Sequence, residues 1–270
     1  MIIDTHVHIG NMLGFNMTES DVIYSMDKYG INYSIVSNIE AAEFDHNIKA
    51  IPKKFRHSQT ECLEKVLDFA KKYPLKIGVG VWVRPFEETA DKNLYSIISK
   101  NRKYIKAVKV HPFHSNIPFD SEKMEQFIEM AEYFNLPVVT HTGNSDVDSC
   151  MRVYNMAKKY PKTNFVMVHM GLETDNSEAI ELISMLPNLY GDTTWVPIKS
   201  TLKLIERTGI EKIIFGSDNP IDGKDTYLHN RTGNKSLYQE YFNELKNFIS
   251  KYDYDLLMYK NAEKLFDIKL

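Results

Sequence analysis

The 270-residue chain is 43% hydrophobic and 26% charged, ordinary proportions for a globular protein that buries a core. Its net charge of −3, without a basic run, gives no electrostatic case for binding nucleic acid or an anionic membrane surface. No apolar run approaches the ~20 residues that cross a bilayer. No secretory signal is expected, and Cys62 and Cys150 lack CxxC spacing, so we expect reduced thiols and a cytoplasmic protein.

Strands and helices are predicted to alternate along the whole chain. The expected strands are short apolar runs at 1–8, 33–37, 75–83, 105–111, 136–141, 164–169, 188–192 and 212–217. The expected helices lie at 19–29, 58–72, 87–102, 121–134, 146–160, 176–186, 197–208, 237–251 and 253–266. Eight such units predict an α/β protein, a single (β/α)8 TIM-barrel domain over residues 1–270. The rival, an open doubly wound sheet, usually carries a glycine-rich phosphate turn, which this chain lacks.

The first strand ends in Asp4-Thr5-His6-Val7-His8. Because side chains alternate between the faces of a strand, His6 and His8 point the same way and form a pair of candidate metal ligands. Taken alone, the pair is equally compatible with two histidines that make ordinary hydrogen bonds.

Other expected strands also end in residues that bind metals. Strand five ends at His141, strand six at His169 and strand eight at Asp218. Strands that all end at one rim of a barrel bring these groups together. Imidazole and carboxylate suit a divalent ion, Zn²⁺ first, with Mn²⁺ or Fe²⁺ as alternatives. Asp218 can both ligate the ion and accept a proton from water, and His169 is either a ligand or a group that orients and polarises the nucleophile.

These motifs resemble the amidohydrolase superfamily. The resemblance is carried by Asp4-Thr5-His6-Val7-His8, by the two later strand-end histidines, and by Phe215-Gly216-Ser217-Asp218-Asn219-Pro220. The closing segment 260–266 resembles the C-terminal helix of the amidohydrolase-related (amidohydrolase 2) branch, which contains aminocarboxymuconate-semialdehyde decarboxylase. The resemblance covers essentially the whole chain.

The resemblance implies a barrel, a divalent metal, and either hydrolysis or non-oxidative decarboxylation. At matching positions it makes His6, His8, His141 and Asp218 the metal ligands. It makes His169 the catalytic histidine.

Lys109 distinguishes a one-metal site from a two-metal site. Other superfamily branches carboxylate a lysine on strand four, which then bridges two metals, and Lys109 stands at that position. In that version His141 and His169 would both serve a second metal. The alternative is an unmodified lysine that forms an ion pair inside the barrel. The remaining motifs resemble the single-metal branch, so one ion is expected and two are the alternative.

Two rim residues are candidates for binding substrate. His111 faces the rim from strand four, and Arg84 ends strand three, where its planar fork could hold a substrate carboxylate. An ion pair of Arg84 with Glu87 or Glu88 is the alternative. Weaker candidates on rim loops are His114, Asn144, Trp195 and Lys224. Histidines expected to be ordinary loop residues are His46, His57 and His229. The polar stretch 219–236 is expected to cover the substrate as a lid.

The leading functional prediction is a metal-dependent hydrolase of a small amide, ester or lactone, with metal-activated water and an oxyanion stabilised by the metal and His169. The alternative is a decarboxylase of a small carboxylic acid with the same ligands. A third interpretation, a metal-binding protein without catalysis, is disfavoured by the complete ligand set. The expected partner is a small-molecule substrate, with no nucleic acid and no membrane; homo-oligomerisation is left open.

Overall fold

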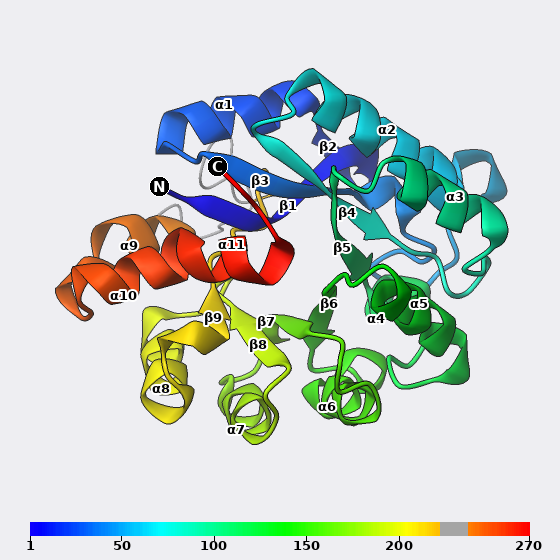
Figure 1. Ribbon diagram of the computed structural model, residues 1–270. Helices are drawn as coiled ribbons and strands as arrows, with labels where there is room; N and C mark the ends of the chain where they lie inside the picture. Colours follow the sequence, from blue (N-terminus) through cyan, green and yellow to red (C-terminus); the bar gives the residue numbers. More distant parts are fainter. Residues whose placement is uncertain (222–236) are drawn as a thin grey trace.

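Eight parallel strands form a closed barrel in the structure, a computed structural model that describes residues 1–221 and 237–270 (Figure 1). Each strand pairs in parallel with the next. They are β1 (Ile3–Met12), β3 (Tyr33–Asn38), β4 (Ile77–Trp82), β5 (Ile105–Val110), β6 (Val138–Gly143), β7 (Phe165–Leu172), β8 (Leu189–Asp192) and β9 (Ile213–Ile214). The ring closes where Thr5 N–H donates to Phe215 O at 3.0 Å. The predicted (β/α)8 barrel is confirmed.

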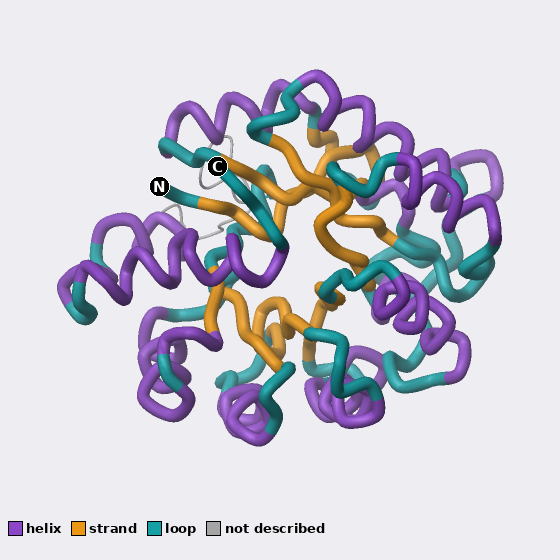
Figure 2. Tube along the Cα trace, viewed as in Figure 1, coloured by secondary structure: helices purple, strands orange, loops and turns teal. Residues whose placement is uncertain are grey.

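Helices surround the strands, which lie inside the ring (Figure 2). They are α1 (Glu19–Tyr29), α2 (Gln59–Lys72), α3 (Lys92–Lys100), α4 (Pro112–Ser115), α5 (Glu122–Tyr133), α6 (Cys150–Lys159), α7 (Ser177–Met185), α8 (Ile198–Thr208), α9 (Leu237–Asn243), α10 (Lys251–Asp255) and α11 (Asn261–Phe266). The capping box predicted before α2 is present, because Ser58 and Glu61 each accept a backbone hydrogen bond from the other. None of the described helices is long and apolar enough to cross a membrane.

Several expected helices differ in extent from those observed. The helix expected at 237–251 ends at Asn243 and is followed by a 3-10 turn at Leu245–Asn247. The helix expected at 87–102 begins at Lys92, because Asp91 caps it by accepting a hydrogen bond from Leu94 N–H at 2.8 Å. The helix expected at 253–266 is interrupted by a π-helical turn at Leu256–Lys260. Within that turn the Leu257 carbonyl accepts a hydrogen bond from Phe215 N–H at 3.1 Å, which ties the C-terminal helices to the barrel wall.

A cluster of apolar side chains fills one end of the barrel interior. Ile3, Val139 and Ile214 from the strands pack there with Phe266 and Ile268 from the C-terminal segment. Because these contributions come from the start of β1 and from the chain's end, the cluster lies at the N-terminal end of the strands. The polar side chains described below lie at the C-terminal end, where barrel enzymes carry their active sites.

An unexpected hairpin extends the first strand. β1 continues to Met12 and pairs antiparallel with β2 (Phe15–Met17), so that Gly10 lies opposite Met17. This hairpin places Leu13 and Phe15 at the cavity above the barrel.

Candidate active site

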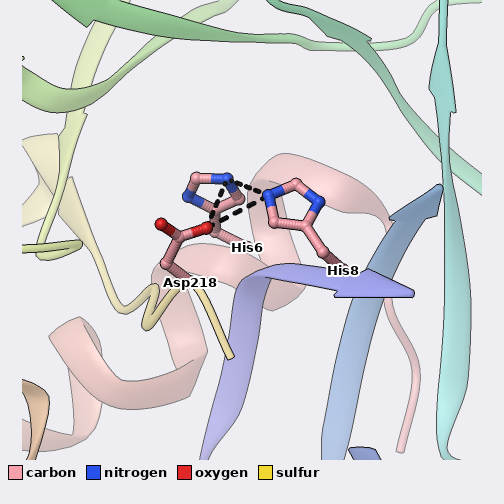
Figure 3. Close-up of side chains that lie close together, drawn as sticks. All are labelled: His6, His8 and Asp218. Atoms are coloured by element: carbon pink, nitrogen blue, oxygen red, sulfur yellow. Dashed lines mark hydrogen bonds and ion pairs between the residues drawn. The ribbon is translucent and has the colours of Figure 1, made fainter. Parts of the chain in front are cut away.

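Three ligand-type side chains meet at the C-terminal end of the barrel (Figure 3). His6 and His8 extend from one face of β1, as strand alternation requires, and Asp218 follows β9. The two Nε2 atoms are 2.9 Å apart. Asp218 Oδ1 lies 3.1 Å from His8 Nε2 and 3.6 Å from His6 Nε2. The structure thus brings together three of the four residues that the resemblance makes metal ligands; we call them the ligand group.

Hydrogen bonds on the far side of each imidazole direct Nε2 toward Asp218. Thr194 Oγ1 gives its proton to Asp192 Oδ2 at 2.5 Å, so it accepts the hydrogen bond from His6 Nδ1 at 3.2 Å. This bond fixes the tautomer in which His6 Nε2 carries a lone pair. His8 Nδ1 shares a hydrogen bond of 3.1 Å with Ser37 Oγ. Partners of this kind orient histidine ligands in metal sites.

The charge states of the ligand group also suit a cation. Burial lowers the pKa of both imidazoles, that of His6 well below its usual range. Burial alone would raise the pKa of the Asp218 carboxyl, but its hydrogen bond with His8 and the positive charge of Lys109 hold it at about 2. Neutral imidazoles and an ionised carboxylate are the forms that bind metal. The donor set therefore fits a divalent metal.

His169 lies beside the ligand group on β7, with its ring centroid 5.6 Å from that of His6. Its Nδ1–H donates to the Thr194 carbonyl at 3.1 Å, which leaves a lone pair on Nε2. Burial lowers the pKa of His169 to about 3, so the ring is neutral. In this form it has no N–H to offer an oxyanion. Stabilisation of an oxyanion by His169 therefore stays a prediction that requires a proton on Nε2; in the present form Nε2 can accept a proton or ligate a cation.

His141, the fourth ligand implied by the resemblance, has other partners. Its Nε2 lies 3.4 Å from Asp148 Oδ2, and its ring stacks on His111 at a centroid distance of 4.0 Å. Among the described residues, the group of converging ligand atoms contains only His6, His8 and Asp218. Ligation by His141 therefore stays a prediction that requires its ring to turn from Asp148.

Lys109 is buried inside the barrel on β5. Its Nζ lies 3.0 Å from His6 Nε2 and 5.8 Å from the centre of the Trp82 ring. Burial lowers its pKa to about 8. Among the described residues no carboxylate lies within ion-pair distance of Nζ, so the expected ion pair is absent there. Carboxylation of Lys109 stays an open alternative.

Arg84 does not reach the cavity described below. It is buried in an ion-pair cluster with Glu43, Glu87 and Glu88, whose nearest oxygens include Glu88 Oε1 at 3.3 Å from Nη1. The expected clamp on a substrate carboxylate is therefore corrected in favour of the alternative ion pairs. Three carboxyl groups therefore surround the guanidinium and keep it away from the cavity lining.

A cavity of about 640 Å³ opens above the ligand group. His111, expected at the rim, lines it and stacks on Trp82 with ring planes 14° apart. The weaker rim candidates His114, Asn144 and Trp195 also line it. Its apolar walls come from Leu13, Phe15, Ile39, Trp82, Phe113, Leu172, Trp195 and Ile221.

Several other predicted residues lie away from the cavity or outside the described residues. Lys224, His229 and most of the expected lid at 219–236 lie outside the described residues. His57 lies 4.0 Å from Glu40, away from the cavity lining. Both cysteines are buried free thiols, as expected.

Sequence reasoning missed several residues of the site. His46 lines the cavity from the long connection after β3, where its sequence position gave no signal. Asp192 and Thr194 hold His6 and His169. Trp195, named above as a weaker rim candidate, donates its Nε1–H to Asp218 Oδ2 at 3.1 Å. The position of Asp192 at the end of β8 is a sequence signal for such a role.

Three residues of the site have a strained backbone. His169, Trp195 and Asp218 have positive φ values of 67°, 58° and 66°. For residues other than glycine this region costs on the order of 1–3 kcal/mol each, and it persists where the surroundings enforce it. Strain of this kind is common at functional sites, so it supports the assignment of this end of the barrel as the active site.

Residues 3–268 match the amidohydrolase family. The chain belongs to that family. This confirms the resemblance and assigns the chain to a family of enzymes rather than to metal-binding proteins without catalysis. Family membership and the ligand group together support a divalent metal. A comparison with curated proteins finds no match.

Solved structures of similar fold are decarboxylases and hydrolases. One is 2,6-dihydroxybenzoate decarboxylase complexed with 2,6-dihydroxybenzoate (TM-score 0.72, 13% identity, 98% of each chain covered). Another is 5-carboxyvanillate decarboxylase from Novosphingobium aromaticivorans, complexed with manganese (TM-score 0.72, 13% identity, 99% of this chain and 96% of that chain). A third is a probable 2-pyrone-4,6-dicarboxylic acid hydrolase from Acinetobacter baumannii (TM-score 0.67, 14% identity, 98% and 99%). At these identities the likeness shows a shared fold.

Proposed function

We propose that this protein is a metal-dependent hydrolase of a small amide, ester or lactone. The observation that carries the proposal is the convergence of His6 Nε2, His8 Nε2 and Asp218 Oδ1 within 4.8 Å of one another at the cavity. Catalytic zinc sites commonly have three protein ligands and keep a position open for water or substrate. We propose Zn²⁺ as the ion, with Mn²⁺ as the alternative because a similar structure contains manganese.

A divalent ion in the ligand group would supply Lewis-acid activation of water and of the substrate carbonyl. Asp218 is the proposed proton acceptor, and Trp195 orients it by donating to Oδ2. His169 presents an unprotonated Nε2 and is proposed to orient the attacking water by accepting its hydrogen bond. Lys109 adds a cationic donor beside the ligand group, with its Nζ 3.0 Å from His6 Nε2.

The test is a screen of amides, esters and lactones with protein loaded with Zn²⁺ or Mn²⁺. Hydrolysis should require metal and should be lost in His8→Ala, because one of three ligands is removed. His57→Ala is the matched control, since His57 lies away from the cavity lining. Hydrolysis that persists in the chelated protein would contradict the proposal.

Decarboxylation is the second candidate, and the aromatic walls of the cavity favour it. Trp82, Trp195, Phe15 and Phe113 suit a flat aromatic acid. An apolar cavity also destabilises a carboxylate relative to neutral carbon dioxide. Asp218 or His169 would have to take up a proton first, because the Asp218 carboxyl is ionised and His169 Nε2 carries no proton, and would then deliver it to carbon. The test is release of CO₂ from 2,6-dihydroxybenzoate and 5-carboxyvanillate, measured beside the hydrolysis screen. CO₂ release without hydrolysis would replace the first proposal by the second.

A further inference from the structure

A second group of histidines lines the cavity outside the ligand group. His111 and His114 have ring centroids 4.3 Å apart, and His46 lies 5.2 Å from His114. All three line the cavity. None of them belongs to the converging ligand atoms among the described residues. They are therefore available for contact with the part of a ligand remote from His6, His8 and Asp218.

Backbone hydrogen bonds fix the tautomer of His114. Its Nδ1 lies 2.8 Å from the Phe44 carbonyl, and a carbonyl can only accept, so Nδ1 carries the proton. Nε2 is then a hydrogen-bond acceptor. The Phe44 segment is held in turn, because Phe44 N–H donates to the His114 carbonyl at 2.8 Å.

His111 has the opposite tautomer. The backbone N–H of His114 donates to His111 Nδ1 at 3.4 Å, so the proton of a neutral His111 ring is on Nε2, which becomes a donor. Trp82 and His141 each stack on this ring with planes 14° apart. Its contacts with a ligand are therefore restricted to the ring edge. The cavity wall thus offers one donor and one acceptor on adjacent rings.

The surroundings favour a neutral ligand group over an anion. Among the described residues that line the cavity there is neither arginine nor lysine, while Asp148 and Glu173 are acidic. Burial lowers the pKa of His114 to about 3, which keeps the ring uncharged near neutral pH. Arg84 is occupied by three carboxylates, as described above.

We propose that His111 and His114 form a substrate subsite for a neutral polar group that both accepts and donates a hydrogen bond, such as a carboxamide. This inference rests on the proposed function only in naming the bound molecule a substrate; the recognition itself is independent of the reaction. A carboxamide oxygen would accept from His111 Nε2–H, and its N–H would donate to His114 Nε2. A group that can only accept, such as a ketone, would leave the His114 nitrogen unpaired, which costs affinity.

Tryptophan fluorescence can report occupancy without any turnover. The chain has two tryptophans, Trp82 and Trp195, and both line the cavity. The probes are benzamide, acetophenone and benzoate, which have similar shape and differ in their hydrogen-bonding group. Benzamide should bind about tenfold more tightly than acetophenone. Benzoate, measured on chelated protein so that no metal can hold it, should bind more weakly than benzamide.

Variants of His114 test the assignment of the acceptor. His114→Phe keeps a flat ring but removes Nε2, so benzamide affinity should fall to that of acetophenone. His114→Gln places an amide oxygen near the former Nε2 and should restore part of the preference. His57→Phe is the control. Equal affinity for benzamide and acetophenone in the parent protein, absence of benzamide binding, or a preference unchanged by His114→Phe would each overturn the proposal.

Nitrogen-15 NMR of histidine-labelled protein gives a check that needs no variant. The expected spectrum at neutral pH has the proton of His114 on Nδ1 and that of His111 on Nε2. A doubly protonated His114, or exchange of the two tautomers, would overturn the subsite. Selective benzamide binding without hydrolysis or decarboxylation would leave the subsite standing and contradict the proposed function. Hydrolysis without selective benzamide binding would support the proposed function and contradict the subsite.

Discussion

His6 Nε2 and His8 Nε2 lie 2.9 Å apart, and both face the same oxygen of Asp218. His6 Nε2 carries a lone pair, because its Nδ1–H is given to Thr194. Polar atoms are usually placed this closely inside a protein only when a proton or a cation joins them. Because the group also includes an ionised carboxylate, a divalent cation satisfies all three atoms better than a single shared proton.

We therefore predict one tightly held divalent metal per chain. Elemental analysis of protein purified without chelator should find close to one ion, and His8→Ala should reduce this strongly. Metal should also raise the melting temperature, because an ion that binds only the folded state stabilises it by about 2.7 kcal/mol at a hundredfold excess over Kd. Absence of metal, together with failure to bind it on reconstitution, would refute the site.

A second prediction concerns Asp218→Asn. The amide keeps an oxygen that can ligate but cannot accept a proton, so turnover should fall further than metal affinity. Positioned acid–base groups contribute about 10²–10⁴-fold, and kcat should drop by that order. Metal content of the same preparation is the control measurement. Near-parental kcat in a metal-loaded variant would remove Asp218 from proton transfer.

The strand-end residues of the site were predictable because strand geometry is local. His6 and His8 share a face by alternation alone, and Asp218 follows from the order of strands in a barrel. His46 was not predictable, because its place depends on how the connection of residues 41–56 folds back. That fold is set by the pairing of Phe44 with Ala50 and by contacts with the segment after β5.

Arg84, in contrast, was predicted to bind substrate but does not line the cavity. Its position at the end of β4 suggested a contact with substrate, but a strand end gives no information on which carboxylates gather around it. Glu87 and Glu88 are close to Arg84 in the sequence, which makes their ion pairs predictable. Glu43 comes from a distant loop and completes the cluster. Its contact with Arg84 depends on the tertiary fold and could not be predicted from the sequence.

A third prediction concerns Thr194, a positioning residue for both histidines. Its hydroxyl accepts from His6 and its carbonyl accepts from His169. Thr194→Val removes only the hydroxyl, so His6 should lose its fixed tautomer and metal affinity should fall about 10–100-fold. Thr194→Ser should restore it. Competition with a chromogenic chelator measures the affinity; equal affinities in all three proteins would show that the hydroxyl has no part in holding His6.

The last prediction concerns Lys109, which separates the one-metal and two-metal versions of the site. Its Nζ lies 3.0 Å from His6 Nε2, the atom that would hold the metal. An ammonium there opposes a cation, whereas a carbamate would attract a second one. Because the rest of the sequence resembles the single-metal branch, we predict an unmodified lysine and one strongly bound ion.

The Lys109→Met substitution distinguishes the two versions, because they predict opposite changes in metal binding. If Lys109 is unmodified, Lys109→Met removes a like charge and metal affinity should rise, while the number of ions stays at one. If it is a carbamate, the same change should lower the metal content, because a bridging ligand is lost. The burial that lowers the pKa of Lys109 to about 8 makes part of the amine neutral near that pH, so the gain from Lys109→Met should shrink as pH rises through this value. Electron density beyond Nζ, with two metals about 3.5–4 Å apart, would show the prediction wrong and favour the binuclear mechanism.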